Sequence, residues 1–189
     1  MQYRKFMAHT PIGTSAKNYP GLYLVNQSDL VNFDLLTIHS AVVTPYLLPQ
    51  PLQINNLYLQ YAACHGISDL LRYTALAIDL NVISSSESHD FLNSTHMIPG
   101  GIEFGIYPVV VFMNLIKKIQ TVSMAFLKTH NPSVLKTNQR RAVSFCNERL
   151  GSFLLTKHLQ HEFNNKIPNE LFGYMHAVTE DCIYKESPR

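Results

Sequence analysis

The segment that most constrains the fold is a long amphipathic pattern over residues 137–163. Apolar residues recur there at steps of three and four, which places them on one face of a helix; they are Ala142, Val143, Cys146, Leu150, Phe153 and Leu154. A second stripe at the same spacing is polar: Arg141, Ser144, Glu148 and Ser152, flanked by Arg140 and Arg149. The pattern predicts a half-buried helix that presents ionic groups along one side, either to a cleft or to solvent as ordinary salt bridges.

The composition is that of a globular domain. Hydrophobic residues make up 46% of the 189 and charged residues only 15%, which is enough apolar surface for a core and excludes a disordered chain. The net charge of +2, with histidine neutral, gives no argument for a polyanionic partner. We therefore predict a single α/β domain over residues 1–189, frayed over 185–189, that binds no nucleic acid.

Cysteine usage and the N-terminus indicate the compartment. The 3 cysteines, Cys64, Cys146 and Cys182, form no C-x-x-C pair, and an odd number fits a reducing environment. The N-terminus lacks a signal-peptide pattern, and no apolar run approaches the ~18 to 20 residues that span a bilayer. These features predict a cytoplasmic protein and leave open a peripheral association with the inner face of the cytoplasmic membrane.

Periodicity predicts the other elements. We expect strands at 21–25 and 40–44, and helices at 55–63, 68–80 (with Ser68 as N-cap) and from about Pro108 to before His130. Shorter helical pieces are expected after Ser28 and Asn169. The polar stretch 84–94 reads as an exposed loop. Residues 97–110 read as a strand or hairpin whose glycines, among them Gly100 and Gly101, let a backbone or a ligand approach closely.

The sequence offers little support for common cofactor and metal motifs. His158 and His161 are three residues apart on the long helix, beside Glu162, but a third ligand at helical spacing is missing, so we predict no metal there. The chain contains no D-x-D, G-x-G-x-x-G, P-loop, G-x-S-x-G or H-E-x-x-H motif. Cys146 falls on the apolar stripe, which predicts a core residue and not a nucleophile.

His65 and Asp69 flank the start of a predicted helix. A carboxylate at this position can orient an imidazole, and the helix N-terminus can face an anion. Alternatively, Asp69 stabilises its own helix and His65 is a loop residue. Local sequence leaves both interpretations open.

Four short segments, taken in order, form a larger pattern. The chain opens MQYRKF, with basic residues at Arg4 and Lys5. The stretch YAACHGISDLL follows, then His96-Met97 leading into IYPVVVF. The fourth segment lies on the long helix and spaces its residues as Arg-x-x-x-Phe-x-x-Glu-Arg-Leu: Arg141, Phe145, Glu148, Arg149 and Leu150.

Together these segments resemble a bacterial family of capsular polysaccharide and lipopolysaccharide glycosyltransferases that carries a His-Tyr-Arg-Arg signature; here Gln2 replaces the histidine and Lys5 the second arginine. The resemblance implies a GT-A-like fold, a mixed sheet flanked by helices, that transfers a sugar from a nucleotide-sugar donor to a surface-glycan acceptor. It implies donor-phosphate binding by Arg4, Lys5, Arg141 and Arg149, and catalysis by Asp69, Glu148 or His65. The remaining cleft residues would be Tyr3, Tyr61, Gly100 and Gly101.

The resemblance leaves several points open. The family fold allows Mn²⁺ or Mg²⁺ at the diphosphate, although this sequence has no D-x-D. Nothing of the nucleotide-binding half precedes Met1, so we expect an incomplete sheet with an exposed edge beside Tyr3–Met7, and little activity of this chain alone. The competing hypotheses are a non-catalytic binding or scaffold protein of a glycan-assembly complex, and an unrelated α/β binding module.

Overall fold

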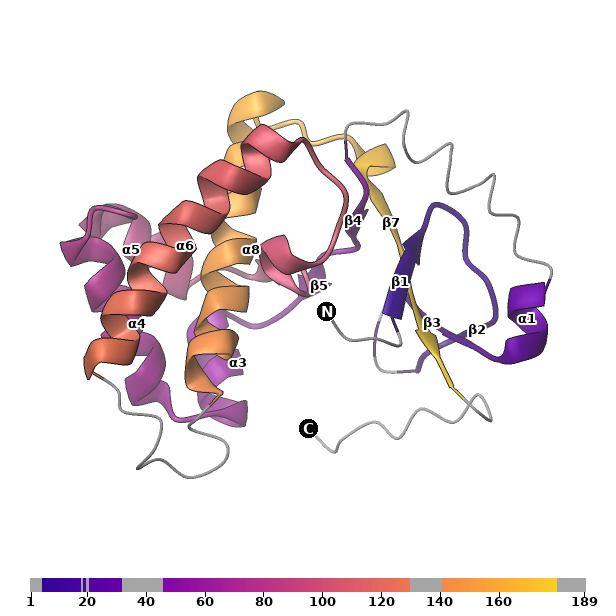
Figure 1. The fold of residues 1–189 in the computed structure, drawn as a ribbon, viewed down its shortest axis with the longest axis horizontal. Coiled ribbons are helices and arrows are strands. Elements are labelled where there is room, and N and C mark those ends of the chain that lie inside the picture. Colours follow the sequence, from indigo (N-terminus) through magenta and orange to yellow (C-terminus); the bar gives the residue numbers. More distant parts are fainter. Residues whose placement is uncertain (1–4, 18, 20, 32–45, 130–140, 180–189) are drawn as a thin grey trace.

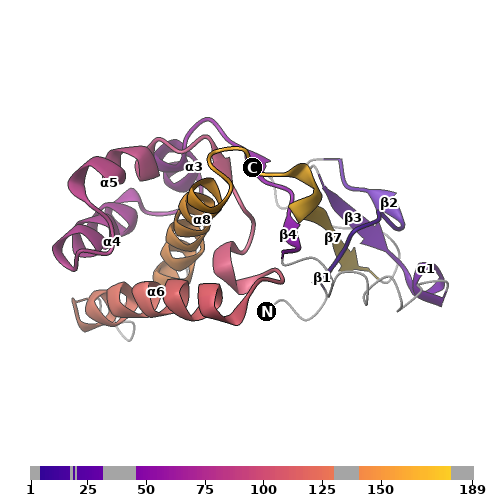
Figure 2. The ribbon, with the colours of Figure 1, turned by 90° about the horizontal axis from the view of Figure 1, so that it is seen from above.

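The chain folds as a group of helices packed beside a small mixed sheet (Figure 1). The computed structural model describes residues 5–17, 19, 21–31, 46–129 and 141–179. Figures 1 and 2 both show the longer helices together on one side of the sheet. The predicted class, a mixed α/β protein with a mixed sheet and helices, is confirmed.

The sheet is built around its last strand. Its order is β1 (Lys5–Ala8), β7 (Phe172–Val178), β3 (Leu22–Val25), β2 (Thr14–Ser15), and β4 (Leu48–Pro49) also pairs with β7. β7 runs antiparallel to β1 and parallel to β3 and β4. A separate two-stranded pair joins β5 (Leu52–Gln53) to β6 (His96–Met97). Among the described residues, β1 stands at one end of the strand order.

Helices α6 (Val109–Thr129) and α8 (Ala142–Glu162) form the centre of the helical part. α8 packs against α6, against α4 (Ile67–Asp79) and against the 3-10 turn η1 (Gly101–Glu103). The predicted apolar stripe of α8 is confirmed, with Cys146 and Leu150 fully buried. The inner face of α6 is also confirmed, with Leu115, Ile119, Val122 and Phe126 in the core.

Two predicted segments were wrong. Residues 84–94 are not a loop but contain α5 (Ser85–Leu92), which begins with a capping box: the Glu87 N–H donates to Ser84 Oγ, and the Ser84 N–H donates to the Glu87 carboxylate. Residues 97–110 are not a hairpin. Only Met97 belongs to a strand, because Gly100 and Gly101, both at positive φ, turn the chain into η1.

Smaller corrections concern helix starts. α4 begins at Ile67 after Gly66, so Ser68 is not its N-cap, and α3 covers Leu57–Cys64 after the cap Asn56. The short helix α1 (Gln27–Val31) begins before the expected Ser28, because Asn26 Oδ1 accepts the Asp29 N–H. After Asn169 there is a 3-10 turn, η3 (Asn169–Leu171), leading into β7, a strand that periodicity did not indicate. The strand expected at 40–44 lies outside the described residues.

The expectation that no apolar segment is long enough to span a bilayer was wrong for α6. Its 21 residues are long and apolar enough to cross a bilayer by length and composition. In the sequence, Lys117 and Lys118 divide this stretch into two shorter apolar runs, and neither run alone is long enough to indicate a membrane span. α6 nevertheless contributes one face to the core, as a helix of a water-soluble protein also does.

Candidate functional site

A cavity of about 400 Å³ lies where the sheet meets the helices. This volume is within the range of small-molecule sites. Its lining comes from four parts of the chain: Lys5 of β1; Met175 of β7; Pro99, Gly100, Glu103 and Phe104 around η1; and Arg141, Ser144, Phe145 and Glu148 of the α8 segment. The polar stripe of the long helix therefore faces a cleft.

The glycine turn lies directly on α8. The Gly100 N–H donates to Glu148 Oε1 at 2.8 Å, and the Ile98 N–H donates to Ser152 Oγ at 2.7 Å. A Cβ on Gly101, whose φ is +55°, would stand 2.5 Å from the Glu148 carbonyl oxygen. The expected close backbone approach at the glycine pair is confirmed, and it fixes the Glu148 carboxylate at the cavity.

Positive charge reaches the cavity from two sides. The Lys5 side chain is half-buried, and this burial lowers the pKa of its ammonium, while the nearby Glu148 carboxylate opposes the shift. Arg141 is exposed, and its guanidinium carbon lies 5.0 Å from the centre of the Phe145 ring. The Glu148 carboxylate lines the cavity together with these two cations, and its Oε2 is 3.4 Å from the guanidinium of the buried Arg149, an ion pair within α8.

The His65 imidazole lies behind this wall, and the Phe145 ring separates it from the cavity. The two rings stack, with centres 4.0 Å apart and planes 15° from parallel. Burial lowers the pKa of His65, and the charge of Arg149 adds to this shift, while Glu148 opposes it. The imidazole is therefore neutral at pH 7. It is not among the residues that line the cavity.

Arg149 of α8 and Tyr61 of α3 pack against each other in the interior. The Arg149 guanidinium is buried and donates to the Phe145 carbonyl oxygen and to Gln60 Oε1, both at 2.9 Å, so it ties α8 to α3. The Tyr61 ring lies 5.1 Å from the same guanidinium, and its hydroxyl is 3.4 Å from the Cys146 Sγ. Burial raises the pKa of the Cys146 thiol to about 12, as expected for a core cysteine.

The predicted site residues therefore fall into three groups. Lys5, Gly100, Arg141 and Glu148 line the cavity, and His65 and Gly101 lie directly behind its wall. Asp69, Tyr61 and Arg149 are buried and do not line it. Tyr3 and Arg4 lie outside the described residues.

Sequence reasoning missed several lining residues. Phe145 belongs to the motif on the long helix, but the sequence assigned it no role. Glu103 and Phe104 closely follow the glycine pair, so they could have been predicted as lining residues. No sequence pattern indicated that Met175 lines the cavity, because its position depends on strand β7, which periodicity did not predict. No family model, curated protein or solved structure matches this chain. The glycosyltransferase resemblance therefore depends on the four segments alone.

The described residues contain no group of three or more His, Cys, Asp or Glu side chains that could hold a metal ion. His158 Nε2 is 3.0 Å from Glu162 Oε2 and 3.1 Å from the Tyr46 hydroxyl, so these side chains satisfy one another. Two carboxylates, Glu103 and Glu148, line the large cavity. Mg²⁺ often uses one or two carboxylates together with substrate phosphates, so this pair fits a metal only when a phosphorylated ligand is present.

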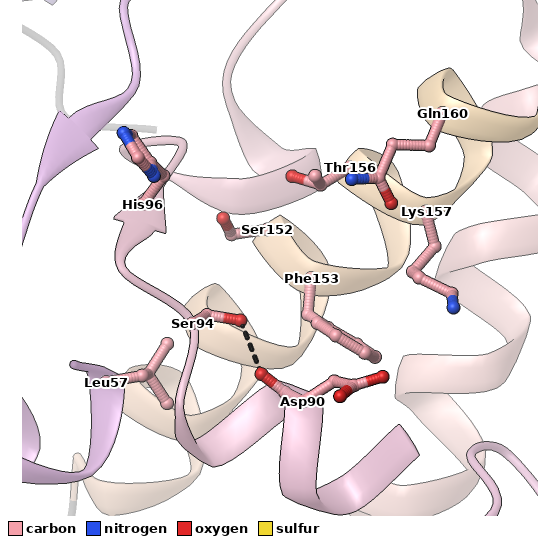
Figure 3. A pocket seen from close by; sticks show the side chains of 9 residues that line it. All are labelled: Leu57, Asp90, Ser94, His96, Ser152, Phe153, Thr156, Lys157 and Gln160. Atoms are coloured by element: carbon pink, nitrogen blue, oxygen red, sulfur yellow. Dashed lines mark hydrogen bonds between the residues drawn. The ribbon is translucent and has the colours of Figure 1, made fainter. Parts of the chain in front are cut away.

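A second, smaller cavity of about 220 Å³ lies between α5, β6 and α8 (Figure 3). Its walls mix apolar and polar side chains, among them Phe153, His96 and Asp90. Lys157 at its rim is 3.6 Å from Glu87, outside the lining. None of the predicted site residues lies here, so the larger cavity is the better candidate.

Proposed function

We propose that this chain is a glycosyltransferase-like protein of GT-A type. It transfers a sugar from a nucleotide-sugar donor to a capsule or lipopolysaccharide acceptor. The observation that carries the proposal is the convergence of Lys5 and Arg141 with Glu148 on one cavity of about 400 Å³. These residues come from the first and last of the four segments that carry the resemblance.

The chemistry follows from the charges. Lys5 and Arg141 bind the donor diphosphate and stabilise the negative charge that develops as it leaves. The acceptor hydroxyl oxygen bonds to the anomeric carbon, the bond from that carbon to the diphosphate oxygen breaks, and the Glu148 carboxylate takes the hydroxyl proton. Phe145 and Phe104 offer apolar ring surfaces for the sugar or the base.

The remaining groups support this arrangement. Gly100 orients Glu148 through its N–H, and neutral His65 holds the Phe145 ring from behind. Mn²⁺ or Mg²⁺, when bound, would supply further positive charge to the diphosphate, and Glu103 is the carboxylate of the lining that would hold it while Glu148 takes the proton. The proposal places the protein in the cytoplasm, where it can act at the inner face of the membrane.

Calorimetry with UDP-, GDP- and CMP-linked sugars, run in parallel with Mg²⁺ and Mn²⁺, tests donor binding. We expect one donor to bind, and Arg141→Ala and Lys5→Ala each to weaken binding about tenfold or more, because each removes a charge-assisted contact. Lys157→Ala, at the smaller cavity, is the matched control and should bind normally. If no donor binds to the wild-type chain, the proposal is wrong.

Transfer is measured separately with the donor that binds. Glu148→Gln keeps the shape of the side chain but cannot take a proton, so we expect donor binding to persist while the rate falls by about 10²- to 10⁴-fold. An unchanged rate would remove Glu148 from the mechanism.

The alternative is a non-catalytic binding or scaffold protein of a glycan-assembly complex. One observation favours it: Asp69 is buried and His65 lies behind Phe145, which leaves Glu148 as the one predicted acid–base residue on the cavity lining. Donor binding without sugar transfer or donor hydrolysis would support this alternative.

A further inference from the structure

The exposed face of α6 carries apolar side chains near its two ends, and between them the exposed residues are Asn114, Lys117, Lys118, Gln120 and Thr121. Its exposed large hydrophobic residues are Val109 (75% exposed), Val110 (71%), Met113 (42%), Met124 (54%) and Leu127 (37%). At 3.6 residues per turn, Val109, Met113, Met124 and Leu127 fall within a sector of roughly 60°. Ile106, also exposed, lies just before the helix. Ile106, Val109, Val110 and Met113 thus form a group of exposed apolar residues where α6 begins, and such groups mark interaction surfaces more often than single exposed apolar residues do.

The charge on this helix is of one sign. α6 contains no Asp or Glu, and all three of its charged residues, Lys117, Lys118 and Lys128, are exposed. By the same helical spacing, Lys117 and Lys128 border the apolar stripe, and Lys118 lies further round. Lysines beside apolar side chains complement an anionic lipid surface, where the apolar residues enter the headgroup region and the ammonium groups meet lipid phosphates.

The position of α6 suits contact in the plane of a membrane. Its other face is fixed in the core by Leu115, Val122 and Phe126, which pack against neighbouring helices. Figure 2 shows α6 along the outer side of the helical group for its whole length. With 21 residues, α6 is about 31 Å long.

We propose that α6 is the surface by which this protein docks, in plane, on a membrane that contains anionic phospholipid. The exposed side chains Val109, Val110 and Met113 insert, and Lys117 and Lys128 contact the anionic headgroups. This surface is separate from the proposed sugar-transfer site, so failure of either test leaves the other proposal standing.

Flotation of the full chain with vesicles tests the docking surface. We expect binding to vesicles of phosphatidylcholine with phosphatidylglycerol, at least tenfold weaker binding to phosphatidylcholine alone, and partial release in high salt. Lys117→Glu with Lys128→Glu should weaken binding to the anionic vesicles about tenfold or more. Met113→Asp and Val110→Asp should do the same, because they place charge among the inserted side chains.

Leu59→Asp is the matched control, because Leu59 is 51% exposed but lies on α3. It should bind like wild type, and circular dichroism should show that every variant is folded. The proposal is overturned by absent binding, by equal binding to both vesicle types, or by equal loss with Leu59→Asp. A dimer in light scattering that Val110→Asp converts to monomer would assign the stripe to a second copy of the chain, which also overturns it.

Discussion

His176, in the middle of β7, shows how strongly one side chain depends on its surroundings. It is fully buried, and the Phe6 ring stacks on it at 4.8 Å between ring centres. The Ile12 N–H donates to its Nε2 at 3.0 Å, so this nitrogen must carry no proton. Burial lowers the pKa of His176 to about 4. The imidazole is therefore neutral in the folded protein over the whole physiological range.

This shift predicts a pH-dependent stability. Between an unfolded pKa near 6.5 and a folded pKa near 4, the unfolded state binds more protons, so stability falls as the pH decreases through that window. We expect His176 to contribute a loss of about 2 to 3 kcal/mol between pH 7 and pH 4.5. His176→Gln, which keeps an acceptor for Ile12, should be less stable at pH 7 but lose less on acidification. Urea unfolding at several pH values measures both, and parallel curves for the two proteins would contradict the prediction.

At the scale of elements, periodicity predicts those helices that bury one clear face. α6 and α8 could be predicted because Leu115, Ile119, Cys146 and Leu150 repeat at helical spacing. α5 buries little beyond Phe91, so the one strong sequence signal for a helix here is the Ser84–Glu87 capping box, which the loop prediction did not take into account. Short polar helices therefore need their capping signals to be read.

β7 could not be predicted for a different reason. Both of its faces are largely covered, so it shows no simple alternation, and it includes Gly173 and His176. A Cβ on Gly173 would stand 2.5 Å from the Leu47 side chain and 2.6 Å from the Ala8 carbonyl oxygen. The presence of Gly173 and His176 in this strand can be explained only when β1 and β4 are paired beside it. The same holds for the site: the ionic side of α8 was predictable, but Met175 was not.

The glycine turn on α8 gives a prediction for stability. Gly101→Ala must place a Cβ 2.5 Å from a backbone oxygen at a positive φ, so we expect a loss of about 2 kcal/mol or more in the free energy of unfolding. Gly66→Ala is the control: its Cβ would meet only Asp69 Oδ2, at 3.7 Å, and its φ is −73°. Ala is a poorer N-cap than Gly, but it also lowers the entropy of the unfolded chain, so the net change in stability should be about 1 kcal/mol or less. Urea unfolding of both variants decides, and equal losses would show that the turn is not fixed by α8.

At the scale of the whole molecule, the described residues form two hydrophobic clusters of unequal size. The larger lies among the helices, and the smaller contains Ala16, Leu22, Leu24, Met175 and Ala177 of the sheet. The candidate cavity lies between them, because Phe145 packs on the larger cluster, while Phe104 packs on the smaller and Met175 belongs to it. A sheet with so small a core should open locally at lower free energy than the helices.

A ligand in this cavity must therefore stabilise the sheet as well as α8. Lys5 reaches it from β1 and Met175 from β7, so binding of the nucleotide-sugar that calorimetry identifies should slow amide hydrogen exchange in residues 5–8 and 172–178, together with 141–148. α5, which contributes nothing to this cavity, serves as the internal control and should exchange at an unchanged rate. At the same donor concentration, Arg141→Ala should reduce the protection in all three segments together. Protection confined to α8 would mean that the ligand does not reach the sheet, and that Lys5 is not part of the site.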